Sequence, residues 1–244
     1  MHKHNVKKSI YILPNLFTTM NLFCGFYSIL ASVNARFEAA AIAILAGTLF
    51  DLMDGKIARA TNTTSSFGME YDSLADLVTF GLAPALLILL WVLEPMGRYG
   101  WCAGFIFLTC GALRLARFNT TASISSDFEG LPIPAAAAMC VSVVLFFFEI
   151  QVDPEPFRVV WLIMMFMLSF LMVSSLRYKS LKKISLFKPM KFNKLAGLIL
   201  VLAAVATEPF IFLFIIFSTY VMSGLALFVV DQLTHKRKTE THIG

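Results

Sequence analysis

Long apolar runs separated by short polar breaks make up most of the chain. A membrane-spanning helix needs about 20 mainly apolar residues, and in lipid its backbone polar groups must be satisfied within the segment. Repeated runs of this kind therefore predict an all-α integral membrane protein, a polytopic bundle of about eight transmembrane helices. The runs predict helices near 13–33, 37–60, 71–93, 99–118, 132–150, 157–176, 193–206 and 209–231.

Composition supports lipid as the main surroundings of this protein. Of the 244 residues, 58% are hydrophobic and only 14% are charged, whereas a soluble domain has roughly 25% charged residues. A soluble α/β enzyme is therefore excluded. The length predicts one membrane-embedded domain over 1–244. We expect the lipid bilayer as a partner and no binding of nucleic acid.

The positions of lysine and arginine predict the orientation. These residues gather before the first helix, in the loop 177–194 and after the last helix, whereas the opposite side has only Arg36, Arg98 and Arg158. Because cytoplasmic loops carry the excess of basic residues, both termini and the loop 177–194 are predicted to be cytoplasmic. The basic residues of that loop can have a topological role alone, or they can also attract anionic lipids.

An unusual group of acids lies in the segment 51–76. It reads D-x-x-D-G-x-x-A-R from Asp51, then eight residues, then G-x-x-x-D-x-x-x-D from Gly68. Asp51 and Asp54 are spaced i, i+3 and Asp72 and Asp76 are spaced i, i+4, so each pair shares a helix face. Two consecutive helices joined by a short loop can therefore present four carboxylates to one point.

These carboxylates need a cation. One Asp in a spanning helix costs about 2.5–3.5 kcal/mol, so four would cost roughly 10 kcal/mol uncompensated. Pairing with Lys56 and Arg59 alone would leave two charges unbalanced. Carboxylate oxygens suit Mg²⁺, Mn²⁺ or Ca²⁺, and four can hold two ions about 3.5–4 Å apart, which is the arrangement used in phosphoryl displacement.

The predicted depth of these acids in the membrane indicates which molecules can reach them. About fourteen residues precede Asp51 in its helix, a rise of ~21 Å through a core of ~30 Å, which leaves its carboxylate ~9 Å below the cytoplasmic boundary. A lipid head group and cytosolic solutes can meet there. Gly55, Ala58 and Gly68 leave space beside the acids for a diphosphate, although close helix packing also explains small residues, and Arg59 can be a topological anchor.

The 51–76 motif resembles the signature of the CDP-alcohol phosphotransferases, and every fixed position is filled. The similarity covers roughly the first 140 residues, and further segments are similar to bacterial phosphatidylserine synthases: 13–18 (LPNLFT), 80–85 (FGLAPA), 111–119 (GALRLARFN) and 130–134 (GLPIP).

The resemblance implies a reaction. A hydroxyl attacks the lipid-linked phosphorus of CDP-diacylglycerol in line and CMP leaves, at the cytoplasmic face of the cell membrane, in a homodimer that binds two Mg²⁺ or Mn²⁺ ions. Asp51, Asp54 and Asp72 would hold one ion, Asp51, Asp72 and Asp76 the other, and Asp76 would take the hydroxyl proton or mainly orient the hydroxyl. The implied CDP-diacylglycerol contacts are Asn15, Thr18, Gly55, Ala58, Arg59, Ser65 and Gly68.

The acceptor alcohol depends on a second basic pair. Arg114 and Arg117, spaced i, i+3 with Asn119 beyond them, are candidates to bind the carboxylate of L-serine. The arginines would equally suit glycerol 3-phosphate or inositol phosphate, or serve as cytoplasmic anchors. Only the resemblance of the segment 114–119 favours serine.

Two other classes of membrane protein also use acids. A cation transporter would favour midplane carboxylates repeated in two halves, and the helices predicted at 157–176 and 193–206 contain neither Asp nor Glu. An intramembrane aspartyl protease would need a second Gly-x-Gly-Asp motif, which the sequence lacks.

Overall fold

The computed structural model describes residues 3–60, 65–121, 130–174, 176 and 207–240, and within these ranges it is helical with no strand. Side chains are described for 14–57, 65–120, 130–174, 176 and 207–224. The main helices are α1 (Lys3–Val33), α2 (Phe37–Ala60), α3 (Ser66–Asp76), α4 (Ala83–Ile88), α5 (Arg98–Thr121), α6 (Ile133–Glu149), α7 (Arg158–Val173) and α9 (Pro209–Glu240).

The predicted all-helical class is confirmed, and several predicted ranges agree closely with the observed helices. The range 37–60 matches α2, and 99–118, 132–150 and 157–176 match α5, α6 and α7 within about three residues. The range 71–93 missed the beginning of α3. The predicted helix at 193–206 and the basic loop 177–194 lie outside the described residues.

One continuous helical run connects Ser66 to Met96. It contains α3, a π-helical turn η1 (Leu77–Leu82), α4, a second π-helical turn η2 (Leu89–Leu93) and a 3₁₀ turn η3 (Glu94–Met96). A π turn widens the helix locally and changes which side chains face a neighbour, and such turns are frequent at functional sites. The first π turn begins directly after Asp76.

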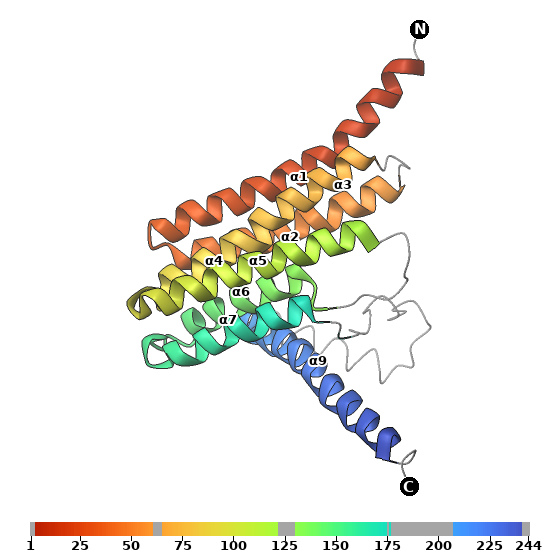
Figure 1. Cartoon of the computed structure of the whole chain (residues 1–244). Helices are drawn as coiled ribbons and strands as arrows, with labels where there is room; N and C mark the ends of the chain where they lie inside the picture. Colours follow the sequence, from red (N-terminus) through yellow and green to blue (C-terminus); the bar gives the residue numbers. More distant parts are fainter. Residues whose placement is uncertain (1–2, 61–64, 122–129, 175, 177–206, 241–244) are drawn as a thin grey trace, which may run out of the picture.

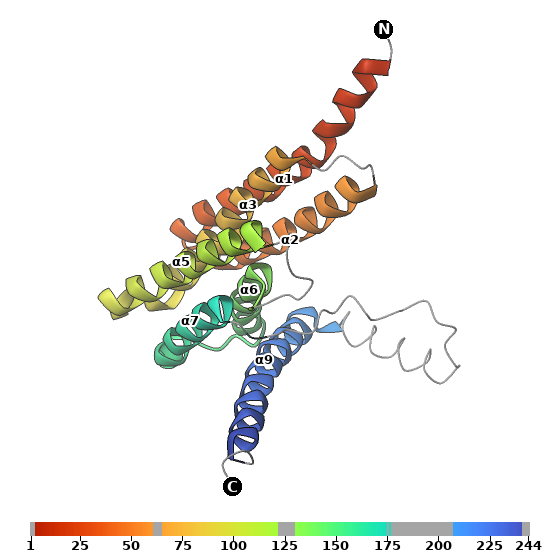
Figure 2. The same cartoon turned by 45° about the vertical axis from the view of Figure 1, so that its right-hand side comes forward.

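The bundle has two distinct ends. Figure 1 shows the turns 34–36, 94–97 and 150–157 together at the left end, whereas the C-terminal end of α2 and the N-terminal end of α3 lie toward the right, as does the N-terminus. The 51–76 motif therefore lies toward the end that the N-terminus occupies. Figure 2 shows that the C-terminal half of α9 extends away from the other helices.

The core lies around α6, which is buried along most of its length and contacts α2 and α9. Gly130, just before α6, has a φ of +78°, and a Cβ atom there would lie 2.5 Å from the carbonyl oxygen of Met172. Only glycine fits this turn. The turn at Gly130 brings the chain against the end of α7, where the N–H of Leu131 donates to the carbonyl of Leu171 at 3.0 Å.

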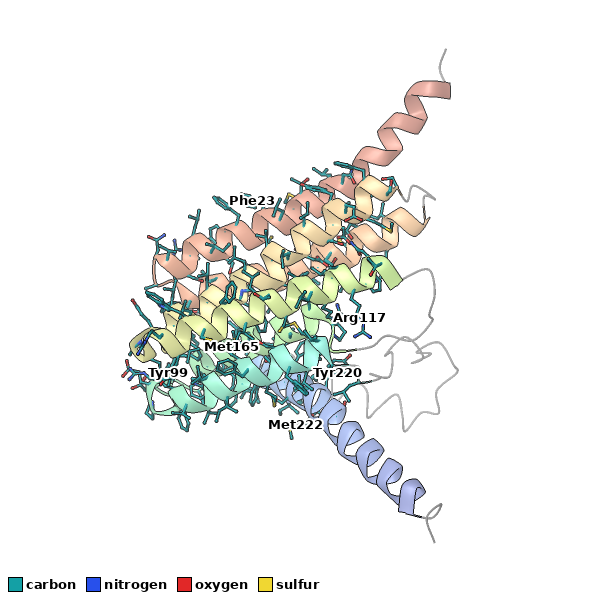
Figure 3. The ribbon with its side chains drawn as sticks, viewed as in Figure 1. Phe23, Tyr99, Arg117, Met165, Tyr220 and Met222 are labelled. Atoms are coloured by element: carbon teal, nitrogen blue, oxygen red, sulfur yellow. The ribbon has the colours of Figure 1, made fainter. Side chains whose placement is uncertain are left out.

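The described residues contain helices suited to a membrane. Four are long and apolar enough to cross one, namely Pro14–Val33, Ser66–Met96, Arg98–Thr120 and Glu155–Val173. Two apolar helices, Ile133–Glu149 and Pro209–Gly224, are shorter. Large apolar side chains also face outward from the bundle, as Phe23 does on α1 (Figure 3). These features are those of a membrane protein.

Candidate metal centre

Three aspartates converge between α2 and α3. Asp51 lies on α2 and Asp72 and Asp76 lie one turn apart on α3, and each offers a carboxylate oxygen within 4.8 Å of the others. We call these three residues the carboxylate cluster. The i, i+4 spacing on α3 and the antiparallel return of the chain from α2 produce this meeting.

The cluster has the donor set of a hard divalent cation. Asp76 is only 9% exposed, and Oδ1 of Asp72 is buried with no hydrogen-bond partner among the described residues. The carboxylate oxygens of Asp51 and Asp76 lie within 4.8 Å of each other. Two ionised carboxylates at such a short separation repel each other unless a proton or a cation lies between them. The residues therefore fit a metal ion with oxygen ligands.

Asp54 adjoins the cluster and has a partner of its own. Its Oδ2 lies 3.0 Å from the hydroxyl of Thr18, which also lies 3.2 Å from the carbonyl of Pro14. Thr18 and Asp54 are both buried. Asp54 remains close enough to Asp51 and Asp72 to interact with their charges. The structure thus gathers three of the four predicted ligands and places the fourth beside them.

Three of the predicted CDP-diacylglycerol residues meet at the start of α3. Ser65 caps the helix, and its hydroxyl accepts a hydrogen bond from the N–H of Gly68 at 3.0 Å. A Cβ atom on Gly68 would lie 3.1 Å from the Ser65 hydroxyl and 3.5 Å from Oδ1 of Asn15 on α1. Asn15, Ser65 and Gly68 therefore surround one point, where α3 presents its N-terminus.

The other predicted contacts lie nearby on α2. Gly55 is half-buried, one residue after Asp54. Ala58 and Arg59 belong to the last turn of α2, and their side chains lie outside the described part of the chain.

The three predicted serine contacts are placed differently from one another. Arg114 is half-buried, and its Nε is enclosed without a hydrogen-bond partner among the described residues. Its guanidinium is close enough to Asp76 for an electrostatic interaction. Arg117 is exposed toward the C-terminal end of α5, and Figure 3 labels it together with Tyr220. Of the two arginines, Arg114 is the more buried.

Asn119 is engaged with the outer side of α3. Its Nδ2 donates to Ser73 at 3.1 Å and to Oε2 of Glu70 at 3.3 Å. These bonds join the end of α5 to the helix that holds Asp72 and Asp76.

A family model described as CDP-alcohol phosphatidyltransferase matches residues 11–174. The match extends through every residue of the carboxylate cluster. This chain belongs to the CDP-alcohol phosphatidyltransferase family. The resemblance seen in the 51–76 motif is therefore confirmed.

Several proteins are similar to this CDP-alcohol phosphatidyltransferase over most of their length. A Helicobacter pylori protein named CDP-diacylglycerol–serine O-phosphatidyltransferase is 38% identical over 220 residues, which cover 88% of this chain and 90% of the relative. A Bacillus subtilis protein of the same name is 34% identical over 171 residues, 70% of this chain and 92% of the relative. A Methanothermobacter thermautotrophicus protein named archaetidylserine synthase is 37% identical over 173 residues, 70% of each chain.

Sequence reasoning missed two residues of this site. The Nδ2 of Asn21 on α1 donates to Oδ1 of Asp76 at 3.1 Å, and the hydroxyl of Thr79 donates to the backbone carbonyl of Asn21 at 2.9 Å. The available signal was a carboxamide inside an apolar run, since such a group needs a partner when buried.

Proposed function

We propose that this chain is a CDP-diacylglycerol–serine O-phosphatidyltransferase, which transfers the phosphatidyl group of CDP-diacylglycerol to L-serine and gives phosphatidylserine and CMP. The observation that carries the proposal is the carboxylate cluster of Asp51, Asp72 and Asp76 in a member of this family. The names of the three relatives share serine as the acceptor and differ in the lipid. The shared acceptor supports serine, and the names of the Helicobacter and Bacillus relatives support CDP-diacylglycerol as the lipid donor.

The proposed cofactor is a pair of Mg²⁺ or Mn²⁺ ions. Asp51, Asp54 and Asp72 would hold one, and Asp51, Asp72 and Asp76 the other. When bound, the ions would supply charge neutralisation for the diphosphate and the leaving CMP. Thr18 supports this set because its hydroxyl holds Oδ2 of Asp54.

The nucleotide side of the site is proposed at the start of α3. Asn15, Ser65 and Gly68 meet there, and a helix N-terminus attracts phosphate through its free N–H groups and its dipole. Gly55, Ala58 and Arg59 would complete this side from α2, together with Thr18. Gly68 leaves no side chain between the backbone and an approaching diphosphate.

The acceptor side is proposed to lie between Asp76 and Arg114. A serine hydroxyl beside Asp76 would donate its hydrogen bond to that carboxylate, which orients the oxygen for attack and accepts its proton. The guanidinium of Arg114 would bind the carboxylate of serine through a charge-assisted pair. Asn119 and Arg117 would assist from the end of α5.

The proposal also includes the arrangement in the membrane. Eight spans would place both termini, the loop 177–194 and the active site at the cytoplasmic face of the cell membrane, within one domain over 1–244. The turns at 34–36, 94–97 and 150–157 lie at the opposite end of the bundle, which supports this orientation (Figure 1). A homodimer, tested by cross-linking or light scattering in detergent, completes the proposal.

The test is release of CMP by the purified full chain from CDP-diacylglycerol with a panel of alcohols. We expect Mn²⁺- or Mg²⁺-dependent release with L-serine, and little with glycerol 3-phosphate, inositol phosphate or inositol. Faster CMP release with a phosphorylated alcohol would identify that alcohol, and not serine, as the acceptor. Metal-dependent cation transport without CMP release would contradict the assignment of this chain as an enzyme.

A further inference from the structure

A buried polar connection joins α1 to the π turn that follows Asp76. Asn21 and Thr79 are both 0% exposed. The hydroxyl of Thr79 holds the backbone carbonyl of Asn21 at 2.9 Å, and the side chain of Asn21 holds Oδ1 of Asp76 at 3.1 Å. Asn21 is thus fixed through its backbone on one side and binds Asp76 on the other.

The carboxamide of Asn21 carries a cost for the fold. A buried polar group costs free energy unless it is paired, and a partly satisfied network is worse than an apolar contact of the same shape. Oδ1 of Asn21 is buried with no hydrogen-bond partner among the described residues. An apolar side chain would avoid that cost, so the effect of Asn21 on Asp76 is the more direct reason for an amide here.

Two glycines keep the connection close. A Cβ atom on Gly25 would lie 2.5 Å from the hydroxyl oxygen of Thr79 and 2.8 Å from its Cα. A Cβ atom on Gly47 of α2 would lie 2.7 Å from Cγ2 of Thr79 and 3.0 Å from Oδ1 of Asn21. The helices α1 and α2 therefore pack directly around Thr79, which restricts the movement of the carboxamide.

We propose that Asn21 is a positioning residue that fixes the orientation of the Asp76 carboxylate, and that Thr79 acts through Asn21. The terminal torsion of Asp has a broad, two-fold preference, so a carboxylate without a fixed partner rotates. A donor on Oδ1 defines where the other oxygen points. This inference rests on the proposed role of Asp76 at the acceptor hydroxyl. It adds a residue of α1 to the groups that orient that hydroxyl for attack.

The experiment compares Asn21→Ala with the parent chain, both purified whole in detergent, by CMP release at varied serine and varied Mn²⁺. We expect kcat to fall roughly 10- to 150-fold, the range for loss of a hydrogen bond to a charged group. The KM for CDP-diacylglycerol should change less than about twofold, because Asn15, Ser65 and Gly68 are left unaltered, and the Mn²⁺ concentration for half-maximal rate should rise. A purely structural role would lower the yield and the Tm but leave kcat of the folded protein unchanged.

Thr79 provides an independent test. Thr79→Val removes the hydroxyl at nearly constant shape and should lower kcat about 2- to 10-fold, whereas Thr79→Ser keeps the donor and should remain near the parent. The double variant Asn21→Ala with Thr79→Val should be no slower than Asn21→Ala alone, because both act on one carboxylate. The matched control is Thr48→Val, because the Thr48 hydroxyl donates within its own helix to the carbonyl of Ile44 at 3.0 Å.

Parent values of kcat and of the Mn²⁺ requirement in Asn21→Ala would overturn the inference. If that variant does not fold, equal activity in Thr79→Val and Thr79→Ser would overturn it instead. Neither result would affect the proposed function, which fails separately if the parent chain releases no CMP with serine or if Asp76→Asn retains full activity.

Discussion

The hydroxyl of Thr18 on α1 lies 3.0 Å from Oδ2 of Asp54 on α2, although 36 positions separate the two residues in the sequence. Both side chains are buried, at 3% and 5% exposure. A buried carboxylate is stabilised by a donor that reaches it, so α1 contributes to the site through Thr18 as well as through Asn21.

The Thr18 contact predicts a difference between two small substitutions. Thr18→Val should lower the rate of CMP release by about 10-fold or more, the effect of removing a hydrogen bond to a charged group. Thr18→Ser keeps the hydroxyl and should stay near the parent rate. Thr109→Val is the control, since that hydroxyl bonds within α5 to Phe105 at 2.8 Å. Equal rates in Thr18→Val and Thr18→Ser would mean that the contact only packs the helices.

Loss of a metal-ligand charge should stop turnover. Asp51→Asn, Asp72→Asn and Asp76→Asn should each abolish CMP release while the protein still inserts and folds, because each removes a carboxylate from a shared site. Asp153→Asn, in the turn where Asp153 accepts from the N–H of Glu155, should keep the parent activity. Chelation should inactivate the parent chain reversibly. A cluster variant that is folded and fully active would disprove the metal assignment.

The two arginines of α5 should behave differently. Arg114→Ala should raise the KM for serine roughly 10- to 150-fold with a smaller effect on kcat, because a carboxylate contact stabilises ground state and transition state alike. Arg117→Ala should have a weaker effect, since its side chain is exposed. Serinol, which lacks the carboxylate, should be a poor substrate and lose little further with Arg114→Ala. An increase confined to the KM for CDP-diacylglycerol would assign Arg114 to the diphosphate instead.

The proposed topology is open to reporter fusions. A reporter after Lys183 or at the C-terminus should read cytoplasmic, and one inserted at residues 153–156 should read external. The reversed pattern would show that the number of spans or the orientation is wrong.

The helices and the carboxylate cluster could be predicted from the sequence because both depend on local spacing. Apolar runs define where α2, α5, α6 and α7 lie. The i, i+4 spacing of Asp72 and Asp76 puts both on one face, and a short connection returns them to Asp51.

The contacts between helices could not be predicted in the same way. Spacing identifies a face but not the residue opposite it, so Asn21 and Thr79 were missed as partners near Asp76. The π turn after Asp76 shifts the register of the helix, and no local pattern marked it. The spacing of Arg114 and Arg117 predicted a shared face, whereas in the structure Arg114 is half-buried and Arg117 is exposed.

The most direct measurement is the rate of CMP release by the purified chain with CDP-diacylglycerol and L-serine, with and without Mn²⁺, for the parent and for Asp76→Asn. We expect CMP release from the parent chain that requires serine and metal together, and no release from the variant. Serine-dependent release that persists without divalent metal, or in Asp76→Asn, would contradict this expectation.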